Sequence, residues 1–326
     1  MSETETPWYL HEIIRTALGT PGRLAGAISL PSGTVNEVWR LEIAEVGDAI
    51  LRIAPSDVAA ASGPSWLTSF GLRREQGVIA LLPDLAAILP GTIHADFSRT
   101  ILDRDWAIQR LVPGRPWSEV DAELTQEQQL DLWRQSGTIC RAIHGVRRGE
   151  FGGVAGPETG LRSRSWAGVL LADGRGFIDD AARFGLDAAP FIALRDAIAR
   201  HRETLDLVTT ASLIHSDLGP RHLFVEPDDR GDWKIVGLID LEFGRFADPM
   251  SESQIEVFDL IPPDPVFQEA FWQGYGAVDH PPGREIRSLV YQAIVLGWVV
   301  TDFARLDRPG EIPSVLVELA TRLADL

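Results

Sequence analysis

The chain has 326 residues, and its 45% hydrophobic and 24% charged residues are typical of a globular protein with one large domain or two lobes. Its net charge of −17 argues against nucleic acid and anionic membranes as main partners. The same charge is compatible with a cationic small molecule as substrate.

Cysteine usage and apolar stretches indicate where the protein works. Cys140 is the only cysteine, so no intrachain disulfide can form, and a reducing, cytoplasmic location is expected. The starting segment MSETETPWYL lacks the basic and then apolar layout of a secretion signal. The longest strongly apolar stretch, residues 289–300, contains Gln292 and is too short to cross a bilayer. We therefore expect no membrane association.

Hydrophobic periodicity divides the first third of the chain into short elements, among which strands dominate. Apolar and polar residues alternate in the strands, glycine and aspartate mark the turns, and Pro83 ends a helix. In chain order we predict a helix at residues 8–18, a hairpin of strands 36–45 and 49–55, a helix at 71–83 and a hairpin at 99–112.

The segment PGRPW at residues 113–117 interrupts these patterns, and we place the boundary between two lobes there. The first lobe covers residues 1–111 and the second covers residues 112–326. The second lobe is predicted to contain helices at 125–146 and 191–208, a strand at 233–243 and further helices after residue 248. A small strand-rich lobe therefore precedes a large helical lobe, and a cleft between them is a natural ligand site.

Two aspartates follow strand-like runs in the second lobe, Asp217 in LIHSDLGPRHLFV and Asp240 in VGLID. Residues 222–226 and 234–239 predict a hairpin, which would bring both carboxylates to one end of the sheet and place His222 beside Asp240. Magnesium binds through one or two carboxylates plus substrate phosphates. With Glu242 near, this cluster therefore fits divalent metal chemistry on phosphates.

The same segment permits other interpretations. His215 and Asp217 are two residues apart, so their side chains share a face of an extended strand, and with His222 they suggest a zinc hydrolase. A structural loop with hydrogen-bonded polar groups is the plainest alternative. Zinc in the purified protein would favour the hydrolase over magnesium-dependent chemistry.

The first lobe contains candidate phosphate-binding groups. Gly33 stands in PSGTVNEVW, just before a predicted strand, where a flexible loop could fold over phosphates with its backbone N–H groups. Arg52 is internal to the strand ILRIA and faces either solvent or an anion. Glu75 lies in the following helix, which could turn it toward Arg52. A strand cation held by a helix carboxylate is a recurrent device of phosphoryl transfer.

In this order along the chain, these features resemble the aminoglycoside and macrolide phosphotransferase family. The segment HSDLGPRH matches the family's catalytic-loop pattern with His215, Asp217 and His222. The segment IDLEFGRFADP matches its metal-binding pattern with Asp240 and Glu242. The resemblance implies an α+β, bilobal protein-kinase-like fold, with a small N-terminal antiparallel-sheet lobe and a larger, mainly helical C-terminal lobe.

Two positions depart from the family's pattern. Arg52 stands where kinases generally carry lysine, and it keeps the positive charge while adding a fork that suits phosphate. Such a replacement fits the composition, because Lys234 is the only lysine among the 30 Lys and Arg residues. His222 takes the place of the commoner asparagine, as in macrolide kinases, and neutral imidazole is a poorer magnesium ligand than an amide oxygen.

The resemblance implies a role for each residue in the transfer of the γ-phosphate of ATP or GTP. Asp217 would accept the proton of the substrate hydroxyl and His215 would brace the loop, while Asp240 would hold Mg²⁺ with the help of His222. Arg52, braced by Glu75, would hold the α- and β-phosphates. Two further groups would cover the triphosphate and the base: Gly33, Thr34 and Asn36 in the loop, and Gln109, Arg110 and Leu111 in the hinge.

An acidic and aromatic segment after Asp240 is the expected acceptor site. From Asp240 to Asp279, both included, the chain has nine acidic residues and one basic residue, Arg245. Such a surface suits the amino groups of a hydroxylated, amine-bearing small molecule, and a solvated helix face is the plain alternative. The candidate acceptor-binding residues are Glu242, Glu252, Glu256, Asp259 and Trp272.

We therefore expect a nucleotide-dependent kinase of a macrolide or aminoglycoside antibiotic, working as a monomer or homodimer. A metabolite kinase of the same fold, of the choline, homoserine or sugar type, is the first alternative, because a fold does not settle the substrate. A nucleotide-binding protein without turnover is the second alternative, and the presence of both Asp217 and Asp240 speaks against it.

Overall fold

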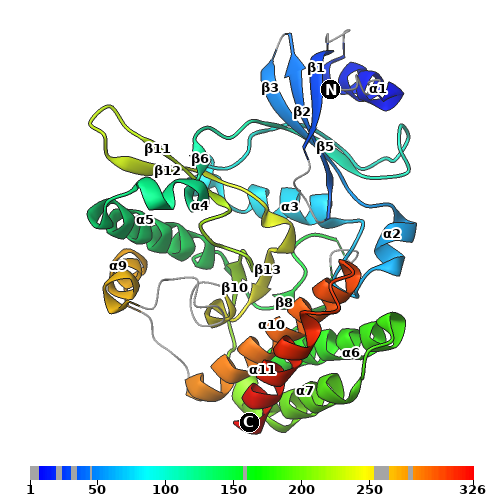
Figure 1. Cartoon of the computed structure of the whole chain (residues 1–326), viewed down its shortest axis with the longest axis vertical. Helices are drawn as coiled ribbons and strands as arrows, with labels where there is room; N and C mark the ends of the chain where they lie inside the picture. Colours follow the sequence, from blue (N-terminus) through cyan, green and yellow to red (C-terminus); the bar gives the residue numbers. More distant parts are fainter. Residues whose placement is uncertain are drawn as a thin grey trace.

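A five-stranded antiparallel sheet forms the framework of the N-terminal lobe (Figure 1). The computed structural model describes residues 7–19, 24–30, 35–44, 46–156, 160–252, 264–277 and 282–326. The strand order is β1-β2-β3-β5-β4, which places β3 at the centre. The strands are β1 (Leu24–Leu30), β2 (Glu37–Ile43), β3 (Gly47–Ile53), β4 (Thr92–Asp96) and β5 (Trp106–Arg110).

The first predicted hairpin is confirmed as β2 and β3, which pair along their whole length. Successive side chains of a strand point to opposite faces of the sheet, so Leu51 and Ile53 face one way and Arg52 the other. The predicted first helix, α1 (Trp8–Leu18), covers the apolar face, where its buried residues join those of the strands in one cluster. The face that carries Arg52 is left for the cleft.

The helix predicted after this hairpin is α3 (Gly71–Ala80), and Pro83 begins a short 3₁₀ helix, η1 (Pro83–Leu85), just beyond it. Leu72, Glu75 and Val78 are all buried and are three residues apart, so one face of α3 carries them inward. A shorter helix, α2 (Asp57–Ser62), lies between β3 and α3. This arrangement places Glu75 against the strand that carries Arg52.

For the predicted hairpin at residues 99–112, the second strand is confirmed and the first strand is wrong. Its second strand is β5, but β5 pairs with β4, which lies earlier in the chain than expected. Arg99 has a left-handed backbone (φ 58°), and its guanidinium binds Asp105 at 2.8 Å and Asp57 at 2.9 Å. Residues 99–105 therefore form a loop held by ion pairs, and their apolar-polar alternation does not reflect strand pairing.

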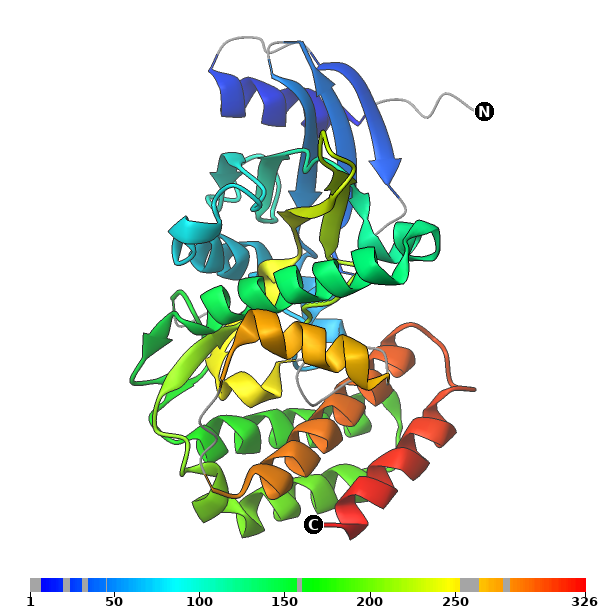
Figure 2. The same ribbon diagram turned by 90° about the vertical axis from the view of Figure 1, so that its left-hand side faces the viewer.

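The chain enters the second lobe between β5 and a short strand, β6 (Arg115–Pro116), which pairs with β11 (Leu223–Pro227) of that lobe. The expected boundary between residues 111 and 112 falls in this connection. The second lobe is mainly helical, as expected (Figures 1 and 2). Its helices are α4 (Trp117–Val120), η2 (Asp121–Glu123), α5 (Gln126–His144), α6 (Trp166–Phe184), α7 (Ala189–Arg200), α8 (Arg202–Leu205), η4 (Leu241–Phe243), η5 (Pro249–Ser251), α9 (Pro265–Tyr275), α10 (Arg284–Arg305) and α11 (Ile312–Ala324).

The helices form two groups. α5 begins with a capping box between Thr125 and Gln128, and it packs along α9 next to the N-terminal lobe (Figure 2). α6, α7, α10 and α11 pack together at the far end of the molecule. By length and composition, α10 is the one described helix that could cross a membrane. A core helix meets the same criterion, and α10 packs against four neighbouring α-helices, α6, α7, α8 and α11, with Tyr291 hydrogen-bonded to Asp248 at 2.7 Å.

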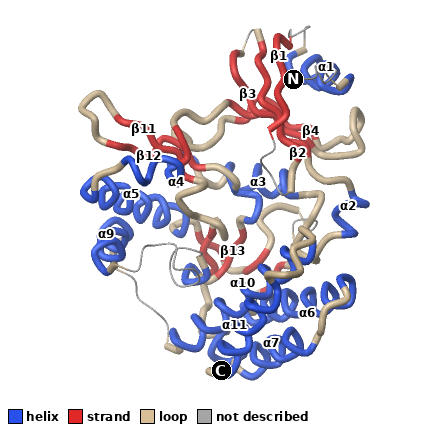
Figure 3. Tube along the Cα trace, in the orientation of Figure 1, coloured by secondary structure: helices blue, strands red, loops and turns tan. Residues whose placement is uncertain are grey.

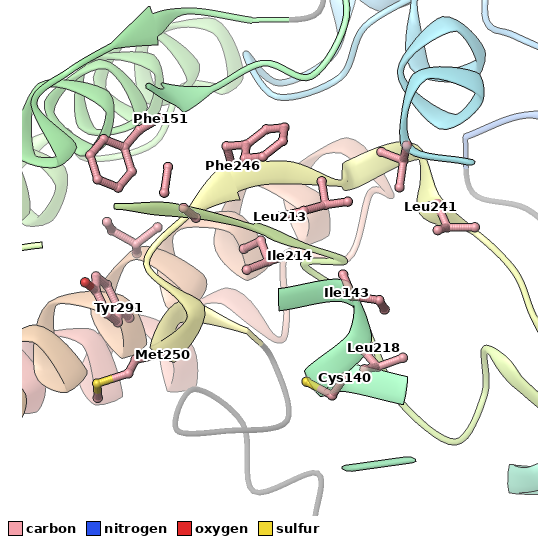
Figure 4. Packing of buried hydrophobic residues seen from close by; sticks show 14 of the residues in the cluster. Cys140, Ile143, Phe151, Leu213, Ile214, Leu218, Leu241, Phe246, Met250 and Tyr291 are labelled. Carbon is pink, nitrogen blue, oxygen red and sulfur yellow. The ribbon is translucent and has the colours of Figure 1, made fainter. Parts of the chain in front are cut away.

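Two small antiparallel sheets lie between these helices and the N-terminal lobe (Figure 3). The predicted hairpin of the second lobe is confirmed as β11 and β12, with a bulge at Phe224 and Val225. The apolar cluster in Figure 4 packs around β10, whose four residues are all buried, and around Leu218 and Leu241 near its end. The remaining strands are β7 (Arg147–Arg148), β8 (Phe151–Gly152), β9 (Arg162–Ser163), β10 (Ala211–Ile214), β11 (Leu223–Pro227), β12 (Trp233–Leu238) and β13 (Arg245–Ala247).

Candidate active site

His215, directly after β10, ties the loop that follows it to two other segments. Its backbone N–H donates to a carboxylate oxygen of Glu252 at 2.6 Å. Its Nε2 lies 3.0 Å from the carbonyl oxygen of Ile239, and its Nδ1 accepts from the backbone N–H of Asp217 at 3.3 Å. Both ring nitrogens of this fully buried imidazole are therefore engaged with backbone. This geometry gives His215 a bracing role.

Asp217 projects from this loop into the cavity between the lobes. Its carboxylate is one-quarter exposed and accepts from Arg221 at 2.5 Å. The backbone carbonyl of Asp217 accepts from Nδ1 of His222 at 2.7 Å, which fixes the loop a second time. The carboxylate is thus the part of the loop that remains accessible to a ligand.

Asp240 stands at the end of β12 in a left-handed backbone conformation (φ 66°, ψ 48°). A non-glycine residue in this region is uncommon and stores backbone strain, which is typical of functional sites. Its carboxylate accepts from Arg52 at 3.0 Å and lies 3.5 Å from Nε2 of His222. Burial would raise the pKa of Asp240, but the charge of Arg52 outweighs this and holds the pKa below its usual range.

His222 is neutral in this environment, because burial lowers its pKa against the opposing pull of Asp217 and Asp240. Its Nδ1 donates to backbone, so the lone pair is on Nε2, which faces Asp240. A carboxylate and a neutral nitrogen beside an open cavity fit a Mg²⁺ ion that takes its other ligands from phosphates and water. Among the described residues there is no group of three His, Cys, Asp or Glu that could hold a metal, so the zinc hydrolase is not supported.

Arg52 is the centre of the charge network in the N-terminal lobe. Its guanidinium binds Glu75, Asp240 and, at 3.6 Å, Glu242. Burial would lower the pKa of Arg52, but these three carboxylates raise it. Glu75 is fully buried and also accepts from Nε2 of Gln109 at 2.6 Å. Strand β3, helix α3 and residues 240–242 therefore meet at one cation, and the side chain of Gln109 supports Glu75.

Glu242 belongs to the second lobe and contacts two residues of the N-terminal lobe. Its buried carboxylate accepts from Asn36 at 2.8 Å, and its backbone carbonyl accepts from Arg74 at 3.0 Å. Burial raises its pKa to about 7, because the opposing attraction of Arg52 compensates only in part. These contacts join the two lobes, and because the Glu242 side chain is almost fully buried, little of its carboxylate is accessible to an acceptor molecule.

Arg52, Asp217, His222, Asp240 and Glu242 line one cavity of about 1070 Å³ between the lobes, which is large enough for a nucleotide and a second small molecule. The roof is formed by β2, β3 and the hinge, including the predicted residues Arg110 and Leu111. The floor is formed by the loop that carries Asp217, by residues 239–243 and by one side of α10.

Comparison with known proteins agrees with this geometry. Residues 27–286 match the phosphotransferase enzyme family over most of the chain. The chain belongs to this family. It is a phosphotransferase of the small-molecule kinase type, with a protein-kinase-like fold, as expected.

The solved structures similar to this phosphotransferase share little sequence with it. A thermostable mutant of aminoglycoside phosphotransferase APH(4)-Ia in its apo form has a TM-score of 0.64 at 15% identity, covering 97% of this chain and 98% of that one. The GDP and kanamycin complex of APH(2")-IIIa has a TM-score of 0.65 at 16% identity, covering 98% and 99%. A putative fructosamine-3-kinase from Haemophilus somnus 129PT has a TM-score of 0.59 at 14% identity, covering 94% and 96%. No match was found among curated proteins.

Two of the residues expected to bind the acceptor, Glu252 and Trp272, do not line the cavity of this phosphotransferase. Glu252 is fully buried, and although burial opposes its ionisation, hydrogen bonds from His144 and the His215 backbone hold its pKa at about 2. Glu252 therefore braces the loop that carries Asp217 and does not line the cavity. Trp272 packs against Phe271 and Tyr275 in α9 and does not line the cavity. Gly33, Thr34, Glu256 and Asp259 lie outside the described residues.

Sequence reasoning missed an aromatic part of the cavity lining of the phosphotransferase. Trp66, Phe243, Trp298 and Phe303 line the cavity, and none of them was a candidate. The signal in the sequence was weak, because the apolar periodicity of α10 is the same for a helix that faces a core and for one that faces a ligand.

Proposed function

We propose that the protein transfers the γ-phosphoryl group of ATP or GTP to a hydroxyl of a small organic molecule. The observation that carries the proposal is the convergence of Asp217, Asp240 and Arg52 on one large cavity between the lobes. A general base, a metal-binding carboxylate and a phosphate-binding cation are the groups that phosphoryl transfer requires, because the reaction depends on positioning and charge neutralisation.

Each group has a defined task in this proposal. Asp217 accepts the proton of the acceptor hydroxyl as its oxygen bonds to the γ-phosphorus, and the bond from that phosphorus to the β-phosphate oxygen breaks to release the nucleoside diphosphate. Arg52, held by Glu75, binds the phosphates. Asp240 and His222 would hold Mg²⁺, which neutralises phosphate charge when it is bound. Glu252 and His215 keep the loop in place.

The adenine or guanine base fits the hinge side of the cavity. Val38 and Ile50 from the sheet and Phe224 from β11 supply apolar surfaces there. The backbone N–H of Arg110 already donates to Gly91 at 2.8 Å. We therefore assign base recognition to the backbone of Leu111 and Val112, which follow it along the cavity.

Two acceptor classes have support. A cationic antibiotic is favoured because similar structures include a GDP and kanamycin complex and a ternary complex with ADP and hygromycin B. A metabolite is the second candidate, because a putative fructosamine-3-kinase has the same fold. A protein that binds nucleotide without turnover is disfavoured, since Asp217 and Asp240 are both in place at the cavity.

The first experiment is a nucleotide-consumption screen of aminoglycosides, macrolides, cyclic-peptide antibiotics and small amino alcohols, with ATP and GTP in parallel. With any acceptor that is turned over, Asp217→Asn should lower turnover by roughly a thousandfold or more, because the base is lost. Its nucleotide affinity should change little, since Asp217 faces the acceptor hydroxyl.

Asp229→Asn is the matched control, because Asp229 is an exposed residue in the turn between β11 and β12. This variant should keep wild-type turnover. An Asp217→Asn protein with turnover close to that of the control would show that the catalytic assignment is incorrect.

A further inference from the structure

One face of α10 forms a wall of the cavity, beside the catalytic loop. Its lining residues recur every three or four positions, which is the spacing of a single helix face. A second, smaller cavity lies beside the first, and it is bordered by Val295 and Trp298 of this face and by Ser216, next to the catalytic Asp217. We call this surface the α10 wall, and it consists of Val295, Trp298, Val299, Asp302 and Phe303.

The aromatic part of this wall is held in position by polar contacts behind it. Thr301 is fully buried, and its hydroxyl donates to the backbone carbonyl of Trp298 at 3.0 Å and accepts from the indole N–H of Trp66 at 2.9 Å. The guanidinium of Arg245 lies 5.3 Å from the ring centre of Trp298. Trp66 in turn contacts Phe243 edge to face, with 5.9 Å between ring centres. A preformed apolar surface of this kind binds ring systems at low entropic cost.

Each carboxylate of the described cavity lining already has an arginine partner. The lining includes four carboxylates, and each has an arginine within ion-pair distance: Asp217 with Arg221, Asp240 and Glu242 with Arg52, and Asp302 with Arg305. A compound with several ammonium groups needs several carboxylates without such partners, because displacing an arginine costs the ion pair that it makes. Asp302 is the one carboxylate in this lining that lies outside the catalytic groups.

We propose that the acceptor is a mostly apolar, hydroxylated ring compound with at most one amine. Its apolar face lies on Trp298 and Phe303, an amine lies near Asp302, and its hydroxyl reaches Asp217. This inference rests on the proposed kinase function and narrows its acceptor class. It separates such compounds from the polyamine aminoglycosides, whose several charges the described lining does not match.

The test measures binding to the full chain without turnover. Erythromycin and other hydroxylated apolar compounds with one amine are titrated by calorimetry, with kanamycin as the polyamine probe, at low and high salt. The apolar monoamines should bind at least about tenfold more tightly than kanamycin, a difference of about 1.4 kcal/mol. Their affinity should depend weakly on salt, because apolar contact is not screened.

Substitutions then locate the site. Trp298→Ala should weaken the apolar monoamines by roughly thirtyfold, as for a buried aromatic anchor, and Trp298→Phe should retain most of the affinity. Trp8→Ala is the matched control, because Trp8 is 68% exposed on α1, outside the cavity. The melting temperature and the nucleotide affinity of each variant show whether it is folded.

Three results would overturn the inference: kanamycin binding more tightly than every monoamine, no binding of any monoamine, or equal affinity of Trp298→Ala and Trp8→Ala. Turnover is scored separately. Monoamines that bind at the α10 wall but release no nucleoside diphosphate with magnesium and ATP or GTP would contradict the proposed function and leave the binding class standing. Turnover of kanamycin alone would support the kinase function and contradict this acceptor class.

Discussion

Glu242 is a buried carboxyl whose protonation state should change near neutral pH. Its folded pKa of about 7 lies above the ordinary value of 4.5, so folding favours the protonated form. The stability of the protein relative to Glu242→Gln should therefore fall as pH rises from about 4.5 to about 7, and should be constant above that. Glutamine keeps an oxygen for Asn36 but does not titrate, so the variant removes this pH dependence.

Thermal melts of both proteins between pH 5 and pH 9 measure this difference. Glu203→Gln is a suitable control, because Glu203 is exposed in α8, away from the cavity. Parallel pH profiles of the wild type and Glu242→Gln would mean that Glu242 titrates at its ordinary value.

The residues that the sequence identified best are those whose spacing is fixed by the local chain. His215, Asp217 and His222 share one short loop, and the hairpin brings Asp240 within 3.5 Å of His222. Glu252 could not be assigned in this way. In the sequence, an acidic residue that faces a ligand cannot be distinguished from one that accepts a hydrogen bond from a buried backbone N–H, as Glu252 does from His215. That difference depends on tertiary packing.

Among the secondary-structure elements, α5 and α9 approach each other so closely that their contact limits side-chain size. A Cβ on Gly137 of α5 would lie 2.1 Å from the backbone carbonyl oxygen of Phe271 in α9. Backbone cannot yield as a flexible side chain can, so Gly137→Ala should force the helices apart and destabilise the protein by about 1–3 kcal/mol. Denaturant unfolding measures the loss, and nucleotide affinity should change less than stability, because this contact lies away from the cavity.

Gly149→Ala provides the comparison, since nothing lies within 4 Å of a Cβ at that exposed position. Equal stability of the two variants would show that α5 and α9 can separate at no cost.

The sequence predicted α1, α3, α5 and the two hairpins β2–β3 and β11–β12 because each has a clear period and a turn signal. It missed α6, whose 19 residues contain three glycines, and it misplaced β4, because ion pairs held the neighbouring loop.

At the scale of the whole molecule, the two lobes are joined at residues 240–242. Arg52 binds Asp240, Asn36 binds Glu242, and Arg74 donates to the Glu242 carbonyl. Both the hinge and this junction border the same cavity, so a ligand in the cavity contacts both lobes. The two-lobed order was predictable from the change of period along the chain. The junction was not, because its partners lie up to 206 positions apart in sequence.

Nucleotide binding should therefore stabilise the two lobes together, and this effect should depend on a divalent cation. At a nucleotide concentration about a hundredfold above its dissociation constant, we expect the melting temperature to rise by about 5 °C with magnesium present. A chelator should remove most of this rise, because the triphosphate then faces the carboxylate of Asp240 with only Arg52 to offset the repulsion. The chelator alone should leave the melting temperature of the nucleotide-free protein unchanged.

Asp240→Asn should make the nucleotide-induced rise in melting temperature nearly independent of the chelator, since the repelling charge is gone. An equal rise with and without the chelator in the wild type would remove Asp240 from the metal site, and thermal melts decide between these outcomes.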